Sequence, residues 1–180
     1  MAVKLPRTIR LDHSDTFVYP RTAEAGEWAV TGTFLFFGVD AAGLSGKERQ
    51  AFRAGFLGID SFGWSTLAVV TEASEEERGA AVERLAEQLV AHCGAPDMEQ
   101  ARRAAEEEIA FAQSLCDHMP NTMLTLHRTA EKAGVRETFS TIRPKLGQLE
   151  PATAFRFVEV DEEEAPGEHV DLVTLSREPK

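Results

Sequence analysis

The chain has 180 residues, of which 43% are hydrophobic, and a formal net charge of −11 at pH 7. This length fits one domain, with or without an appended segment, and the hydrophobic fraction is too high for a disordered chain. The acidic balance argues against nucleic acid and anionic membranes as partners, because both attract basic surfaces.

Two short strands are predicted near the N-terminus, over residues 8–12 and 16–20. Both segments contain β-branched residues, which favour strands. The polar residues His13-Ser14-Asp15 between them predict a turn.

Residues 28–37 are predicted as a longer strand, because aromatic and β-branched side chains dominate the segment. Alternation places Phe34 and Phe36 on one face of this strand and Leu35 and Phe37 on the other. A strand that is apolar on both faces needs cover on both. We therefore expect its second face to meet more of the core, a second subunit or an apolar ligand.

A short helix is predicted from Ser45 to Gly55, because the spacing of Ser45 and Glu48 matches a capping box. A segment with several glycines follows it, and aromatic and β-branched residues then predict a strand over 64–72.

Two longer helices are predicted in the middle of the chain. The first starts at the capping box formed by Ser74 and Glu77 and ends at Gly94, and the second starts at Asp97 and ends before Pro120. The tight connection between them predicts an antiparallel helical hairpin. Its apolar faces are expected to hold Val82, Leu85, Ala86, Leu89, Val90 and Cys93 in the first helix, and Met98, Ala101, Ala105, Ile109, Ala112, Cys116 and Met119 in the second.

Two hairpins are predicted after the helices. Residues 123–130 and 135–143 flank a short turn that ends in Gly134, which is typical of a β-hairpin. Residues 155–160 and 170–175 are expected to form a second hairpin around an acidic loop, or else to belong to a loosely attached tail.

Strands on both sides of a helical hairpin predict an α+β fold, with an antiparallel or mixed sheet and the long antiparallel helical hairpin packed on one face. We expect residues 1–145 to form a single α+β domain. Residues 146–180 are expected to be an acidic C-terminal extension, which either adds a β-hairpin to the sheet or stays loosely attached.

The negative charge is concentrated in two segments. Residues 72–119 carry four basic and twelve acidic side chains, and residues 145–180 carry four and nine, whereas residues 1–71 are neutral. We interpret the acidic segments as a solvated helical face and a solubilising tail. The alternative is an acidic docking surface for a basic partner.

The compartment is inferred from two absences in the sequence. The N-terminus lacks the apolar stretch of a secretory signal, and no run approaches the roughly 18 apolar residues of a membrane span. Two cysteines give no disulfide framework. We expect a cytoplasmic protein with no membrane partner.

The catalytic and metal-binding motifs that we tested do not fit. Gly46-Lys47 is followed by Glu48, where a phosphate-binding loop needs Ser or Thr, so nucleotide hydrolysis is rejected. Cys93 and Cys116 lie roughly 28 Å apart along the expected hairpin, at about 1.5 Å per residue, which is too far for one metal ion. We predict no metal and no cofactor.

Binding residues are therefore sought in the glycine-rich segment and among the histidines. Loops with several glycines commonly carry binding residues, although the alternative is a tight connection that needs positive φ angles. Histidine supplies acid/base groups near neutral pH. The candidates are Arg53, Asp60, Ser61, Trp64, His118 and His127.

Four segments carry a resemblance to known sequences. They are LPRTIRLDHSDTFV (5–18), GEWAVTGTFLFF (26–37), AFRAGFLGIDSFGWSTL (51–67) and LCDHMPNTMLTLHRT (115–129). In these segments the chain resembles a family of small uncharacterised proteobacterial proteins, over about residues 4–145. The resemblance implies a bacterial cytoplasmic protein and assigns no activity and no functional residue.

Two functions follow as expectations. The first is a cytoplasmic accessory or scaffold protein that acts through protein–protein contacts, forms a homodimer and is not an enzyme. The alternative is a small-molecule-binding protein or enzyme with its site in the glycine and aromatic loop 53–64.

Overall fold

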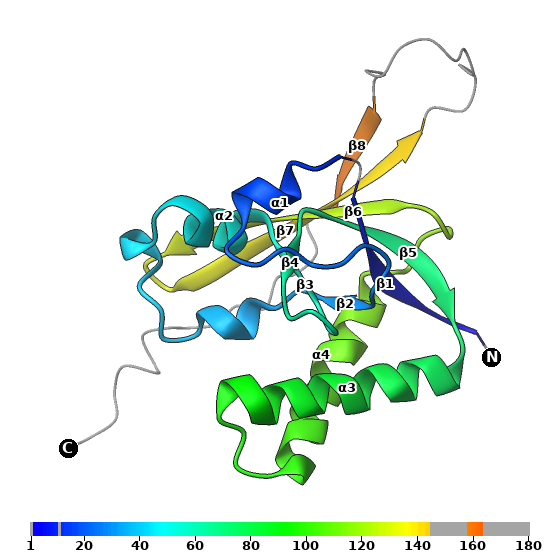
Figure 1. Ribbon diagram of the computed structural model, residues 1–180. Helices are drawn as coiled ribbons and strands as arrows, with labels where there is room; N and C mark the ends of the chain where they lie inside the picture. Colours follow the sequence, from blue (N-terminus) through cyan, green and yellow to red (C-terminus); the bar gives the residue numbers. More distant parts are fainter. Residues whose placement is uncertain (1, 11, 145–157, 164–180) are drawn as a thin grey trace.

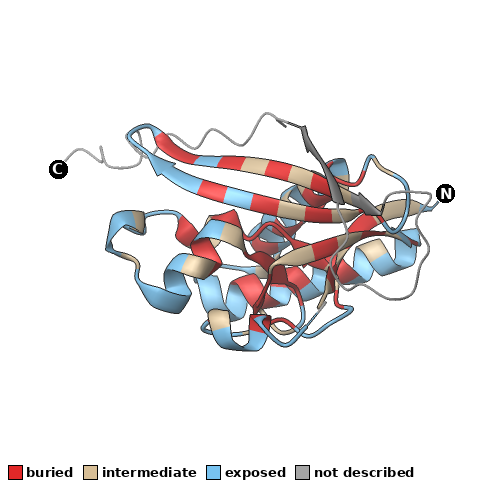
Figure 2. Ribbon diagram, turned by 90° about the horizontal axis from the view of Figure 1, so that it is seen from above, coloured by how far each residue is buried: buried red, intermediate tan, exposed pale blue. Residues whose placement is uncertain are grey.

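The fold is α+β, as the sequence predicts. The computed structural model describes residues 2–10, 12–144 and 158–163. It contains two antiparallel sheets (Figure 1): a five-stranded sheet in the order β1-β5-β6-β7-β8 and a three-stranded sheet in the order β2-β3-β4. Figure 2 shows the helices below the long β6–β7 ladder, so they cover one of its two faces.

The strands of the larger sheet are β1 (Val3–Ile9), β5 (Leu67–Ala73), β6 (Met123–Glu131), β7 (Gly134–Pro144) and β8 (Val158–Glu163). The smaller sheet consists of β2 (Ala29–Val30), β3 (Phe56–Gly58) and β4 (Trp64–Ser65). The helices are α1 (Asp15–Val18), α2 (Gly46–Ala54), α3 (Glu75–Cys93) and α4 (Met98–Ser114), with 3₁₀ turns η1 (Thr33–Phe36) and η2 (Ala41–Gly43).

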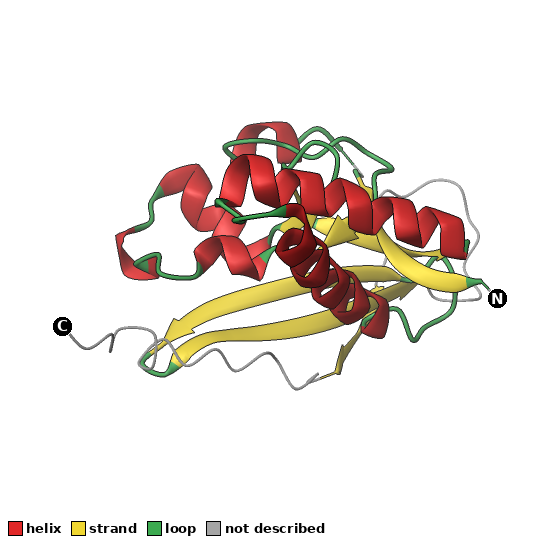
Figure 3. Cartoon of the chain, turned by 90° about the horizontal axis from the view of Figure 1, so that it is seen from below, coloured by secondary structure: helices red, strands yellow, loops and turns green. Residues whose placement is uncertain are grey.

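The helical hairpin α3–α4 forms where it is predicted. Ser74 Oγ accepts a hydrogen bond from the Glu77 amide at 3.1 Å, and the Glu77 carboxylate accepts one from the Ser74 amide at 2.8 Å, which completes the capping box. Gly94, at φ 68°, ends α3, and Asp97 caps α4. Figure 3 shows the two helices crossing obliquely.

The prediction of the two apolar helical faces is wrong near the C-terminal ends of the helices. Val90, Cys93 and Met119 are exposed, and α4 ends at Ser114 rather than before Pro120. The chain turns tightly after Ser114, and this turn buries Leu115 and Cys116 but leaves Met119 in solvent.

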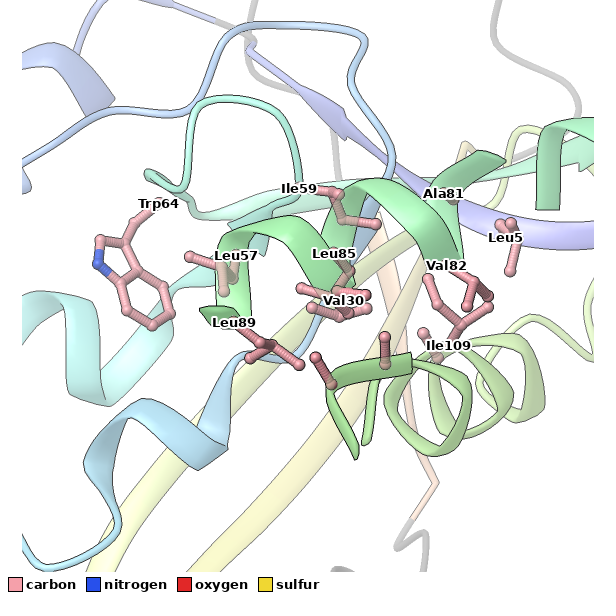
Figure 4. Packing of buried hydrophobic residues seen from close by; sticks show 14 of the residues in the cluster. Leu5, Val30, Leu57, Ile59, Trp64, Ala81, Val82, Leu85, Leu89 and Ile109 are labelled. Atoms are coloured by element: carbon pink, nitrogen blue, oxygen red, sulfur yellow. The ribbon is translucent and has the colours of Figure 1, made fainter. Parts of the chain in front are cut away.

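The main core joins the two sheets to the helical hairpin. Figure 4 shows Leu85 and Leu89 of α3 and Ile109 of α4 beside Val30 and Leu57 of the small sheet. All five side chains are buried. A second cluster lies between the end of α4 and the inner face of β5, β6 and β7, and its buried members are Ala29, Phe56, Ala68, Val70, Leu115, Cys116, Leu124, Leu126 and Phe139.

The β6–β7 hairpin is also confirmed. Its register runs from Met123 opposite Ile142 to Glu131 opposite Gly134. Burial alternates along both strands, so one face contacts the helices and the other, which includes His127, is open.

Of the second predicted hairpin, the structure describes one strand. β8 starts at Val158 and pairs with β7. It includes residues 161–163, which were expected in a loop, because their backbone extends the ladder with β7. The predicted strand 170–175 lies outside the described residues.

The predicted strand over 28–37 is wrong. Only β2 is extended there; Gly32 then adopts φ 76°, and η1 follows. A Cβ on Gly32 would lie 2.6 Å from Leu57 Cβ, so this close approach requires glycine. The strand with two apolar faces, which supported the expectation of a dimer, is therefore absent.

Smaller corrections concern the N-terminal third. Residues 15–18 form α1 instead of starting a strand, because the amides of Phe17 and Val18 bond back to Ser14. The first strand spans Val3–Ile9, where it pairs with β5. α2 starts after Ser45 as expected, but the Ser45 side chain makes no capping bond. Within the described residues, no helix is both long and apolar enough to cross a membrane.

Candidate ligand-binding cavity

Strands β6 and β7 carry two different environments on their inner face. Near the hairpin turn, Arg128 lies directly opposite Glu137 in the ladder. Both side chains are buried, and Arg128 is 0% exposed. Toward the other end of the ladder, the inner face consists of Leu124, Phe139 and Thr141.

Arg128 and its polar neighbours form what we call the Arg128 centre: Arg128, Glu137 and Thr33. Arg128 Nε donates to Glu137 Oε1 and to Thr33 Oγ1, both at 2.9 Å. Thr33 Oγ1 in turn donates to Glu137 Oε1. Arg128 Nη2 donates to the Thr31 carbonyl. The centre therefore joins the β6–β7 hairpin to Thr31 and to Thr33, the first residue of η1.

The same guanidinium caps α2. Arg128 Nη1 donates to the carbonyls of Phe52 and Gly55, both at 3.0 Å, where the negative end of the helix dipole favours a cation. Phe36 and Trp64 stack with ring centroids 5.3 Å apart, and the guanidinium lies 5.4 Å from the Phe36 ring. Burial lowers the pKa of Arg128, and the charge of Glu137 opposes this shift.

The other end of the ladder leaves a cavity of about 240 Å³ between the sheet and the end of α4. We call it the α4 cavity. It is lined by Ser114, Leu115, Asp117, His118, Leu124, Phe139 and Thr141.

The buried lining of the α4 cavity is mostly apolar. Leu115, Leu124 and Phe139 are all buried, and the Phe139 ring meets Phe111 of α4 edge to face, with centroids 6.0 Å apart. Thr141 adds one buried hydroxyl. An apolar floor with a few polar groups is typical of sites for small organic molecules.

The polar lining comes from the chain that follows α4. Asp117 is exposed and His118 is half-buried. Lys4 Nζ donates to the His118 carbonyl at 2.7 Å, and the Asn121 amide donates to the Val70 carbonyl at 2.8 Å. These bonds attach the segment to β1 and β5 and hold it in position beside the cavity.

The candidate residues from the sequence are dispersed. His118 lines the α4 cavity, whereas His127 is exposed on the opposite face of β6. Arg53 is exposed on α2, and Trp64 is buried in the core. The structure therefore places these four residues at separate locations.

Asp60 and Ser61 take part in an internal contact. Glu27 Oε1 accepts hydrogen bonds from the amides of Asp60 and Ser61 and from Ser61 Oγ, each at 3.0 Å. The buried Glu27 carboxylate occupies the inside of the glycine-rich loop. The loop amides and the Ser61 hydroxyl thus bind a carboxylate of the protein itself.

Sequence reasoning missed Arg128, although a signal is visible. Leu124, Leu126 and Arg128 occupy the same phase of the alternation in β6, so a charged side chain falls at an inward position. Such a residue needs buried partners, and Glu137 on the paired strand is one of them.

A second, smaller cavity of about 130 Å³ lies beside Asp15. The Asp15 carboxylate accepts hydrogen bonds from Thr66 Oγ1 at 2.8 Å and from the Thr66 amide at 3.2 Å. Tyr19 contacts the same hydroxyl, and burial raises its pKa to about 12. Among the described residues, no three His, Cys, Asp or Glu side chains are arranged to hold a metal ion.

These features define an α+β protein in which a helical hairpin packs against a five-stranded sheet and a cavity lies between this sheet and the end of α4. The chain belongs to a family of unknown function, DUF6505, whose model matches residues 1–164. The match includes β8, which ends at Glu163. No curated protein and no solved structure matches the chain.

Proposed function

We propose that this protein binds a small organic molecule in the α4 cavity. The observation that carries the proposal is the combination of a buried apolar floor, made by Leu115, Leu124 and Phe139, with polar groups at the edge. The location between a helix end and a sheet also favours a preformed site, because both walls belong to regular elements.

The contact that Ser114 makes at the cavity edge argues against a nucleophilic serine. A catalytic serine would be expected to bond a neighbouring base, but Ser114 Oγ donates to the Phe111 carbonyl at 2.5 Å. We propose that the protein acts by binding, in an accessory role, and is not an enzyme. The sequence resemblance supports placing it in the bacterial cytoplasm, and its two free cysteines agree with a reducing compartment.

A fragment screen by protein NMR on the ¹⁵N-labelled full chain tests the proposal. Bound fragments are expected to shift amide resonances of residues 114–118 and of Leu124, Phe139 and Thr141. The Ser114→Trp variant places a large ring at the cavity edge, on an exposed position, and is expected to abolish these shifts. Thr129→Trp, at an exposed position on β6, is the matched control.

The proposal fails if no fragment shifts the cavity resonances, or if Ser114→Trp retains the affinity of the unmodified chain. A folded spectrum of Ser114→Trp is needed for this comparison. Because Ser114 is exposed, the substitution is expected to leave the fold intact.

A second candidate function is protein–protein contact through a homodimer. It is supported by two large apolar side chains in solvent, Phe17 at 72% and Met119 at 73% exposure. Sedimentation velocity at micromolar concentration is expected to detect a dimer, and Phe17→Asp or Met119→Asp to weaken it. A monomer for the unmodified chain would contradict this candidate.

A further inference from the structure

Helix α2 carries three exposed basic side chains, which we call the α2 cations: Lys47, Arg49 and Arg53. The two buried residues of this helix are Ala51 and Phe52. The acid of α2, Glu48, precedes them by three and four residues, so it lies on their side of the helix. The cations therefore occupy the part of α2 that faces solvent, away from Glu48.

The α2 cations differ from the arginines of the helical hairpin in their lack of carboxylate partners. None of the three forms an ion pair with a residue that the structure describes. Each arginine of α3 and α4, in contrast, pairs with a carboxylate: Arg78 with Glu106, Arg84 with Asp60 and Glu87, Arg102 with Glu83, and Arg103 with Glu99. In a chain with a net charge of −11, α2 presents positive charge that no described carboxylate pairs with.

The fold does not depend on the charge of Arg53. A cation near the end of a helix commonly stabilises its negative pole. At α2 the buried Arg128 already does so, because its Nη1 donates to the carbonyls of Phe52 and Gly55. Arg53 is exposed and bonds to no other described residue. Its charge is therefore available to a partner.

Arg49 is held in position beside the chain that precedes α2. Its Nε donates to the Leu44 carbonyl at 2.9 Å. The two Nη atoms make no bond to a described residue. Guanidinium groups bind carboxylates through two parallel hydrogen bonds, and an anchored guanidinium with free Nη atoms is prepared for such a contact.

Two apolar side chains lie in solvent in the same connection, which Figure 1 shows next to α2. Phe37 is 41% exposed and Val39 is 37% exposed. The preceding residue, Phe36, packs edge to face on Phe52 of α2, with ring centroids 5.2 Å apart. Asp40, the acid of this connection, accepts a hydrogen bond from the Ala42 amide and caps η2. Exposed basic and apolar groups thus occur together at this end of the molecule.

We infer that α2 and the connection before it dock an acidic segment of another protein, in which carboxylates alternate with apolar side chains. Arg49 and Arg53 are about 6 Å apart along the helix, close to the spacing of about 6.8 Å between alternate residues of an extended strand. The apolar residues of the segment contact Phe37 and Val39. The α4 cavity lies toward the other end of the β6–β7 ladder and takes no part, so this inference goes beyond the proposed function.

The charge of the whole chain favours this partner over other anions. A nucleic acid or an anionic membrane extends beyond α2 and meets an acidic protein, which repels it. A second copy offers the acidic side of its helical hairpin, but that contact joins two different surfaces and leads to open chains of molecules. A short acidic segment meets only the α2 cations within the screening length of about 8 Å.

Three short fluorescent peptides test the inference. In the first, aspartate alternates with leucine; in the second, asparagine replaces aspartate; in the third, serine replaces leucine. Each is titrated with the full chain at pH 7 and low salt, and binding is measured by fluorescence anisotropy. The first is expected to bind most tightly. The second is expected to bind about tenfold or more weakly, because two exposed charge contacts are lost and each changes affinity by up to about fivefold. The third is expected to bind severalfold more weakly, because its apolar contact is lost.

Two double variants locate the contact. Arg49→Gln/Arg53→Gln is expected to weaken the aspartate–leucine peptide about tenfold. Arg102→Gln/Arg103→Gln makes the same change in net charge at exposed positions of α4 and is expected to change the affinity by less than about twofold. All four positions are exposed, so both variants are expected to fold, and their amide spectra check this.

Several outcomes would overturn the inference. An aspartate–leucine peptide that does not bind, or that binds no better than its asparagine counterpart, excludes an acidic partner. Equal losses in the two double variants place the contact away from α2. Equally tight binding of a single-stranded oligonucleotide or of phosphatidylserine vesicles assigns a different class of partner.

Two further results would name an occupant other than a second protein. Salt-sensitive oligomers of the unmodified chain in sedimentation velocity, abolished by Arg49→Gln/Arg53→Gln, would identify a second copy. Shifts of amide resonances from residues 145–180 in the peptide-free double variant would identify the acidic C-terminal segment of the chain itself.

Discussion

The two halves of the β6–β7 ladder show opposite ways of covering a sheet. Near the turn, the inward residues are Arg128 and Glu137, which bond to each other. Arg128 also donates to carbonyls at the end of α2, to the Thr31 carbonyl and to the Thr33 hydroxyl. At the other end, Leu124, Phe139 and Thr141 face a cavity.

The difference follows from the cost of burying each kind of group. A buried charge without partners is strongly unfavourable, so neighbouring segments must approach until its hydrogen bonds are made. An apolar wall beside a gap loses only some dispersion contacts, which are individually small. The charged half is therefore closed, and the apolar half is able to leave room for a ligand.

Among the predicted changes, removing the positive charge of Arg128 is expected to lower the stability of the protein most. Arg128→Met leaves Glu137 buried without its cation and removes the donors from the end of α2. The free energy of unfolding is expected to fall by about 3–5 kcal/mol in urea denaturation. Arg102→Met, which breaks the exposed pair with Glu83, is expected to cost less than about 1 kcal/mol.

The double variant Arg128→Met/Glu137→Leu sharpens the same test. Replacing both charges with apolar side chains removes the uncompensated anion, so the loss is expected to be smaller than in Arg128→Met alone. Equal losses in the single and double variants would show that the Arg128–Glu137 pair does not determine the stability of this half.

Glu27 is a second buried carboxylate, and disturbing its contacts is expected to cause an intermediate loss of stability. A Cβ on Gly58 would lie 2.1 Å from Glu27 Oε1, so Gly58→Ala displaces the carboxylate from the loop amides. Thermal or urea unfolding is expected to show a loss of about 1–3 kcal/mol.

Gly79→Ala is the matched control for Gly58→Ala. Gly79 lies inside α3 with no atom near its Cβ position, so alanine is expected to stabilise the protein by about 0.5–1 kcal/mol. A loss at Gly79 equal to that at Gly58 would contradict the role assigned to Glu27.

The apolar half is expected to respond to pH. Burial raises the pKa of the Cys116 thiol from 9.0 to about 12. Between these values the unfolded chain loses a proton that the folded chain keeps, so stability falls as the pH rises, by about 1.4 kcal/mol per pH unit. Tyr19, with its pKa raised to about 12, adds a similar loss above pH 10.

Urea unfolding measured from pH 8 to pH 11 checks this slope. Cys116→Ala is expected to flatten the slope between pH 9 and 10, where the thiol is the main titrating group. Cys93→Ala, at an exposed cysteine, is expected to flatten it less. A slope that is unchanged in Cys116→Ala would place the titration elsewhere.

Local patterns were sufficient for the helical hairpin and the β6–β7 hairpin. The capping box at Ser74, the left-handed Gly94 and the turn before Gly134 involve contacts within a few residues, so neighbouring side chains decide them. His118 was also a candidate from the sequence, and it lines the cavity. Its role as a ligand contact stays a prediction.

Patterns failed where distant segments compete for the backbone. Residues 28–37 have the composition of a strand, but Gly32 lies against Leu57 and Trp64. The Thr31 carbonyl accepts a hydrogen bond from Arg128. Residues 15–18 likewise form a helical turn beside Thr66. Contacts about 25 to 100 residues apart in sequence are invisible to periodicity.

By itself, the sequence determined the α+β class, the acidic balance, the helical hairpin and the alternation of β6, because composition and short-range spacing specify them. Only the tertiary structure decided that Arg128 meets Glu137 and the end of α2, and that α4 stops early enough to leave a cavity. The physical reason is that burial depends on which segments pack together, and this packing is settled by the whole chain at once.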